Sequence, residues 1–95
     1  MIRLYKKLQA RQEFILSSQL LRSGTNIGVN VEEALLGSKQ SFVSSISLAA
    51  KEARETRYWL KLLQESRLVD IDVTHELNEI NDLLYLFSQV TQSSH

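Results

Sequence analysis

The sequence predicts an all-α protein: one domain spanning residues 1–95, with four helices of which the first is short. Three observations lead to this fold. The chain has no proline, so no ring interrupts a helix. Apolar residues recur at alternating steps of three and four, the spacing of a helix packed nearly parallel to its neighbours. The strict apolar–polar alternation of β-strands is absent.

The first helix is expected over about residues 2–10 and the second over about residues 13–36. The first has apolar positions one turn apart at Met1, Leu4, Tyr5 and Leu8. In the second, one row of residues keeps helical phase along the whole segment: Leu16, Leu20, Ser23, Ile27, Asn30 and Ala34. Because the phase continues through residues that favour turns, we predict a helix here rather than a loop.

Within the second helix, the stretch RSGTNIGVNVEEA has two glycines four residues apart, Gly24 and Gly28. Each glycine inside a helix costs about 0.8–1 kcal/mol relative to alanine. The two lie on one face, where missing side chains let another backbone approach. We therefore expect Gly24 and Gly28 to mark close packing against a neighbouring helix.

The third helix is expected over about residues 39–66 and the fourth over about residues 74–91. The row of the third is Phe42, Ile46, Ala49, Ala53, Thr56, Leu60 and Leu63. That of the fourth is Leu77, Ile80, Leu84 and Phe87. Ser38 is the expected N-cap of the third helix, and Asp72 or Thr74 that of the fourth, because short polar side chains bond the free N–H groups of a first turn.

Polar residues fall beside the predicted core and need partners, because a buried unpaired polar group costs roughly 1–3 kcal/mol. If the second and third helices form a hairpin around Gly37, Asn30 faces Ser44 and Ser45, and Arg22 lies near Glu52 and Glu55. We call the predicted set the polar spine. Its members are Arg22, Ser23, Asn30, Glu33, Glu52 and Glu55.

The net charge is zero, but the charges are unevenly distributed. Residues 1–31 have five basic side chains and one acidic one, whereas the chain from Asp70 onward has five acidic side chains and no Lys or Arg. The basic end comprises Arg3, Lys6, Lys7 and Arg11. It could contact the phosphates of a nucleic acid such as RNA, or it could neutralise the acidic fourth helix in a compact bundle.

The rest of the composition limits where in the cell the protein is expected. There is no cysteine, no signal-peptide apolar region and no apolar run long enough for a bilayer, so we expect a cytoplasmic protein with no membrane partner. A chain of 95 residues is near the lower limit for burying a core unaided, which leaves self-association open.

No catalytic, metal or cofactor site is predicted, and no small-molecule substrate is evident. His75 with Glu79 one turn later is a two-ligand pair without companions, and His95 is the last residue. Glu52 and Glu55 could serve as an acid/base pair, but the nearby basic side chains favour ion pairing. The serines lack both a nucleophile motif and a histidine to activate them.

The two adjacent aromatic residues of the third helix are Tyr58 and Trp59, which cannot share a face. We expect one to pack in the bundle and the other to lie at its edge, with Trp59 as the candidate subunit contact.

The segment from Gln19 to Ser66 resembles the bacterial four-helix bundle proteins of the 23S rRNA intervening-sequence family. The residues that match the family's pattern are Gln19, Arg22, Ser23, Ile27, Asn30, Glu33, Ser38, Phe42, Ala49, Lys51, Glu52, Glu55, Tyr58, Trp59 and Leu60. The sequence departs from the pattern at Asn26, Ser41 and Ser45, which puts in doubt any role that needs the charge lost there.

The resemblance implies an antiparallel up-down four-helix bundle, here with a shortened first helix, that assembles into a ring-like homopentamer. It also implies likeness in fold to the accessory variability protein of diversity-generating retroelements, which binds nucleic acid and a reverse transcriptase. Relatives have several more turns before the equivalent of LYKKL. We therefore expect an apolar groove along the second and fourth helices, filled by a neighbouring subunit or, if Met1 is not the true start, by the missing turns.

From these observations we expect a non-enzymatic, homo-oligomeric bundle with a structural or interaction role. The alternative is a nucleic-acid-binding accessory protein that uses the basic end.

Overall fold

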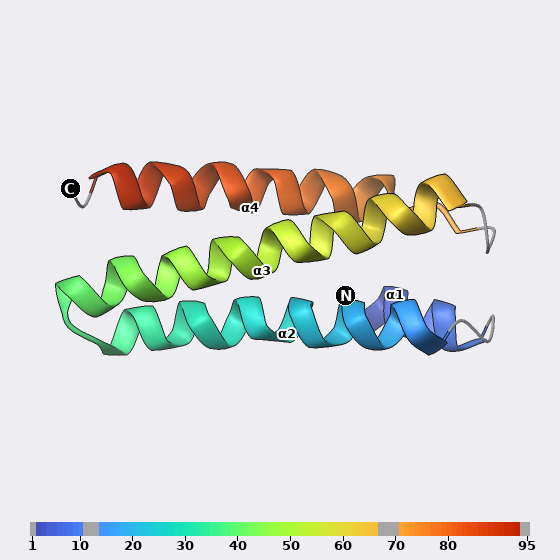
Figure 1. Cartoon of the computed structure of the whole chain (residues 1–95), viewed down its shortest axis with the longest axis horizontal. Coiled ribbons are helices and arrows are strands. Elements are labelled where there is room, and N and C mark those ends of the chain that lie inside the picture. The colour runs from blue at the N-terminus through green and yellow to red at the C-terminus, as the bar shows by residue number, and fades with distance from the viewer. Residues whose placement is uncertain (1, 11–13, 67–70, 94–95) are drawn as a thin grey trace.

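The computed structural model describes residues 2–10, 14–66 and 71–93 of the chain, and it contains four helices in these ranges. They are α1 (Ile2–Ala10), α2 (Phe14–Leu36), α3 (Lys39–Ser66) and α4 (Thr74–Ser93). Successive helices run antiparallel, and the molecule extends 43 × 19 × 15 Å (Figure 1). The all-α antiparallel bundle with a short first helix is thus confirmed.

The helices contact one another in chain order. Within the described residues, α1 packs on α2, α2 on α3 and α3 on α4, while α1 approaches neither α3 nor α4 through its backbone. Figure 1 shows α3 between α2 and α4, with α1 beside the N-terminal part of α2 only. One side of the bundle is therefore incompletely covered.

Most members of the predicted helical rows form the core, whereas Asn30 of the second row is only half-buried. On α3 the buried residues are Ile46, Ala49, Ala53, Thr56, Leu60 and Leu63. On α2 they are Leu16, Ser17, Leu20, Ser23, Ile27 and Ala34. Leu4 and Leu8 of α1 and Ile80 and Phe87 of α4 are also buried. Apolar burial of this kind supplies about 25 cal/mol per Å² and stabilises the bundle.

Polar side chains mark where two of the helices begin. The amide of Ser41 donates to the hydroxyl of Ser38 at 3.2 Å, as an N-cap requires. At α4, the amide of Thr74 donates to the Asp72 carboxylate at 3.0 Å, and the Thr74 hydroxyl donates to the same oxygen at 2.6 Å. Both helix starts lie where the sequence predicted them.

The stretch containing Gly24 and Gly28 is helical throughout, inside the 23-residue helix α2. The predicted role of Gly28 in close packing is wrong. A Cβ atom added at Gly28 would meet nothing within 4 Å, because this part of α2 lies beyond the end of α1. Gly24 is half-buried and lines a hollow between α2 and α4.

No helix in the described ranges has both the length and the apolar character needed to cross a membrane.

Candidate interaction surfaces

The contact between α2 and α3 has a buried pair of hydroxyls at its centre. Thr56 donates to the Ser23 Oγ at 2.7 Å, and both residues have no exposed surface. The Ser23 hydroxyl donates in turn to the Gln19 carbonyl at 3.0 Å, and the Glu52 carbonyl lies 2.9 Å from the Thr56 hydroxyl. No buried hydroxyl lacks a partner here, so the pair fixes the register of the two helices without a desolvation penalty.

Arg22 of α2 forms ion pairs with two carboxylates of α3. Its guanidinium binds Glu55, and it lies 3.7 Å from the Glu52 Oε2. The Arg22 side chain is 46% exposed, so solvent screens the attraction and limits it to about 0–1 kcal/mol per pair. Such a cluster suits a structural role, since the same cation lies beside both carboxylates.

The structure brings together only part of the predicted polar spine. Glu33 is exposed and forms no ion pair with a described residue. Asn30 is half-buried, and no described hydrogen bond joins it to Ser44 or Ser45. Asn30 does not meet the predicted serines because the register differs from the prediction by about one helical turn, and Glu33 has no ion pair that would place it in the polar spine. Ser23 faces Thr56, and the same shift places Asn30 level with Ala49.

Of the two adjacent aromatic residues, Trp59 is the half-buried one and packs against the core, while Tyr58 is 58% exposed. Their rings still meet edge to face, with centroids 5.1 Å apart and planes at 71°. The Trp59 indole N–H lies 3.5 Å from Glu55, a long contact. Tyr58 is therefore the more exposed of the two, and the subunit contact of Trp59 stays a prediction.

The described part of the basic end is exposed. Arg3, Lys6 and Lys7 lie on the solvent side of α1 and form no ion pair with any described residue. Arg11 lies outside the described residues. Hydrogen bonds from Thr74 lower the pKa of Asp72, and the positive charge of Lys7 adds a smaller effect in the same direction.

His75 in the first turn of α4 and Glu79 one turn later form an exposed ion pair at 2.9 Å. Their side chains are 81% and 62% exposed, and no third His, Cys, Asp or Glu within the described residues completes a metal-binding group. An exposed pair of this kind is typical of the solvated start of a helix.

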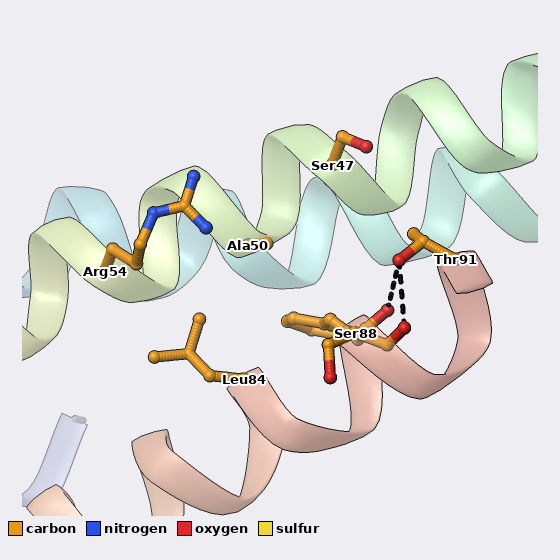
Figure 2. A pocket seen from close by; sticks show the side chains of 7 residues that line it. Ser47, Ala50, Arg54, Leu84, Ser88 and Thr91 are labelled. Carbon is orange, nitrogen blue, oxygen red and sulfur yellow. Dashed lines mark hydrogen bonds between the residues drawn. The ribbon is translucent and has the colours of Figure 1, made fainter.

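A hollow of about 240 Å³ lies between α3 and α4, near the end of α4 (Figure 2). Its lining residues are Ser47, Ala50, Arg54, Leu84, Phe87, Ser88 and Thr91. The hydroxyls of Ser88 and Thr91 bond carbonyls of their own helix, as the dashed lines for Thr91 show. The other polar groups of the lining are the Arg54 guanidinium and the Ser47 hydroxyl, and the rest of the lining is apolar.

A second hollow, of about 190 Å³, lies between α2 and α4. It is lined by Gly24, Ile27, Glu76, Glu79, Ile80 and Leu83. This is the place where an apolar groove was predicted, and its cause is the short α1, which leaves this side of the bundle without a fourth full-length helix.

Together the fold and these surfaces define the class of protein: a small helical bundle whose described residues form surfaces suited to contact with other molecules. The chain belongs to the family described as 23S rRNA-intervening sequence protein, which it matches over residues 1–89. It is also similar to a crystal structure of a protein of unknown function from the S23 ribosomal protein family of Bacteroides thetaiotaomicron. The two share 35% sequence identity with a TM-score of 0.87, over 96% of this chain and 84% of that chain. No curated protein matches the chain.

Proposed function

We propose that this protein is a non-enzymatic, cytoplasmic helical bundle that associates with copies of itself and acts through its surfaces. The observation on which this proposal depends is the amount of apolar surface exposed on one copy. The exposed large apolar residues are Ile2, Phe14, Ile15, Val29, Leu35, Leu36, Leu48, Tyr58, Leu62, Tyr85 and Leu86. Several of them exceed half exposure, and extensive exposed apolar surface is typical of a protein–protein interface.

The small size of the chain supports the same proposal. Most soluble assemblies consist of identical chains in a closed arrangement, and a small domain gains stability when association covers apolar surface. We propose a pentamer as the assembled state, following the family resemblance.

The proposal also states that the protein does not catalyse a reaction. It is supported by the character of the charged groups: Glu52 and Glu55 are held by Arg22, and the His75–Glu79 pair is exposed to solvent. Catalytic acids and bases are usually found in clefts that perturb their pKa values.

The experiment is a light-scattering measurement of molar mass from low to high micromolar protein concentration. We expect a mass that is a multiple of the 10.9 kDa chain. A constant mass of 10.9 kDa over the whole range would refute the proposed self-association.

A second candidate function is RNA binding through the basic end, favoured by the exposure of Arg3, Lys6 and Lys7 without ion-pair partners among the described residues. A ring would repeat this weak site and raise the apparent affinity by multivalency. The test is a titration of single-stranded and duplex RNA at several salt concentrations. Phosphate contacts predict an affinity that falls steeply with salt, and no binding at low salt would refute this candidate.

A further inference from the structure

The hollow between α2 and α4 is an acidic groove with an apolar floor. We use the name acidic groove for the surface formed by Gly24, Ile27, Glu76, Glu79, Ile80 and Leu83. Helices α2 and α4 lie on either side of α3 and do not contact each other through their backbones, which leaves the groove open between them (Figure 1). Ile27 and Ile80 are 8% and 4% exposed and form its buried base.

The charged groups of the acidic groove are carboxylates whose hydrogen-bonding capacity is incompletely used. The Glu76 Oε1 is shielded from solvent and has no hydrogen-bond partner among the described residues. Glu79 is paired with His75, which is a cation only when protonated. Among the described residues, no Lys or Arg lines the groove. A carboxylate next to an apolar surface is stabilised when a cation approaches, so the groove favours a partner that presents a basic side chain beside apolar ones.

A surface of that description exists on the outer side of α3. We call it the α3 stripe, and it consists of Leu48, Lys51, Tyr58 and Leu62. Their spacings of three, seven and four residues place them on one face of the helix. Leu48, Tyr58 and Leu62 are 49%, 58% and 38% exposed, and Lys51 is exposed without an ion-pair partner in the described ranges.

The α3 stripe and the acidic groove lie on opposite sides of the molecule. The buried row of α3, which includes Ala49, Ala53 and Leu60, faces the interior that α2 and α4 enclose. At about 100° per residue, the stripe lies roughly 150° around the helix from that row. One copy therefore has a convex basic and apolar face on one side and a concave acidic and apolar face on the other.

We propose that the α3 stripe of one copy docks in the acidic groove of the next copy, with Lys51 opposite Glu76 and Glu79. This inference rests on the self-association proposed above and names the two surfaces that meet. The contact is heterologous, so repeating it gives a ring where the rotation closes. Glu55 is close to the stripe, but it is already paired with Arg22. The charge of Lys51 is therefore available to pair with the carboxylates of a neighbouring copy.

The experiment measures self-association by sedimentation equilibrium in three variants of the full chain: Lys51→Glu, Glu79→Lys and the double variant with both changes. Each single variant puts like charges opposite each other, and we expect its dissociation constant to rise about tenfold or more. The double variant restores opposite charges and is expected to return to within a few-fold of the unmodified protein. Matched controls are Lys61→Glu on α3 and Asp82→Lys on α4, both exposed and outside the two surfaces.

The possible results separate this inference from the proposed function. A chain that stays monomeric without any substitution refutes the proposed self-association itself. Association that neither single variant weakens beyond its control shows that other surfaces are used, as would be the case if a different protein occupied the groove. Weakening in the single variants without recovery in the double variant refutes the pairing of Lys51 with the groove. Circular dichroism of every variant confirms that the helices are intact.

Discussion

The hydroxyl pair between α2 and α3 gives a quantitative test of the helix register. Ser23 and Thr56 have no exposed surface, and their oxygens are 2.7 Å apart. Removing either hydroxyl leaves the other with a partner on its own helix, at the carbonyl of Gln19 or of Glu52. No buried donor is left unpaired, so each single change should cost only the interhelical bond, about 1 kcal/mol.

The perturbation is a double-mutant cycle with Ser23→Ala, Thr56→Val and the combined variant. Because both changes remove the same bond, the combined variant should also lose about 1 kcal/mol, and the coupling energy should be about 1 kcal/mol. For a chain of this size, each single change should lower Tm by roughly 4–8 °C. Urea denaturation followed by circular dichroism at one fixed protein concentration measures the free energies of unfolding.

The matched control for this cycle is Thr25→Val on the same helix. Thr25 is exposed, and its hydroxyl bonds carbonyls of its own helix, so the change should stay within about 0.5 kcal/mol. A combined Ser23/Thr56 variant that loses the full sum of its two single losses would show that these hydroxyls share no bond. The register described for α2 and α3 would then be wrong.

Two further predictions concern glycine and a helix start. Gly28→Ala should raise the free energy of unfolding by about 0.8–1 kcal/mol because its Cβ enters open space, whereas Gly37→Ala should lower it by about 1 kcal/mol or more because its Cβ would lie 2.8 Å from that of Ser41. Urea denaturation measures both, and changes of the same sign would contradict the local geometry. Hydrogen bonds from Thr74 lower the pKa of Asp72 below 3.8, so the resulting stabilisation exists above the unfolded-state pKa and is lost as pH falls through the folded-state pKa. The stability difference between the unmodified protein and Asp72→Asn should therefore shrink below about pH 4 in thermal unfolding, and a difference that is constant with pH would contradict this account.

The helices and much of the core could be predicted because side-chain spacing alone determines which face of a helix is buried. In α3, every member of the predicted row from Ile46 to Leu63 is buried. The row even includes Thr56, a polar residue that a search for apolar side chains alone would have left out.

The role of Gly28 depends on whether another helix lies beside it, and the residues of α2 alone do not show this. The row of Gly24, Gly28 and Leu35 keeps helical phase, yet Gly28 and Leu35 are exposed. A row of period seven rotates by about 20° per heptad around a straight helix, and α1 does not extend along α2 far enough to cover it. The residues of α2 do not show how far α1 extends along them.

The polar contacts between helices were predicted only in part. Arg22 reaches Glu52 and Glu55 even though the register is shifted, because its long side chain tolerates about one turn of error. Asn30 has a short side chain, so the same shift places it out of reach of its predicted partners. The orientation of Tyr58 and Trp59 also depends on the exact rotation of α3, which the spacing of apolar residues determines only approximately.

The most direct test of contact between the α3 stripe and the acidic groove uses the absence of cysteine from the chain. Two proteins are prepared, one with Lys51→Cys and one with Glu79→Cys, and each alone and their mixture are treated with a short bis-maleimide cross-linker. The account predicts a cross-linked species of two chains in the mixture and little in either protein alone. Equal cross-linking in all three samples, or none in the mixture while the protein remains associated, would contradict it.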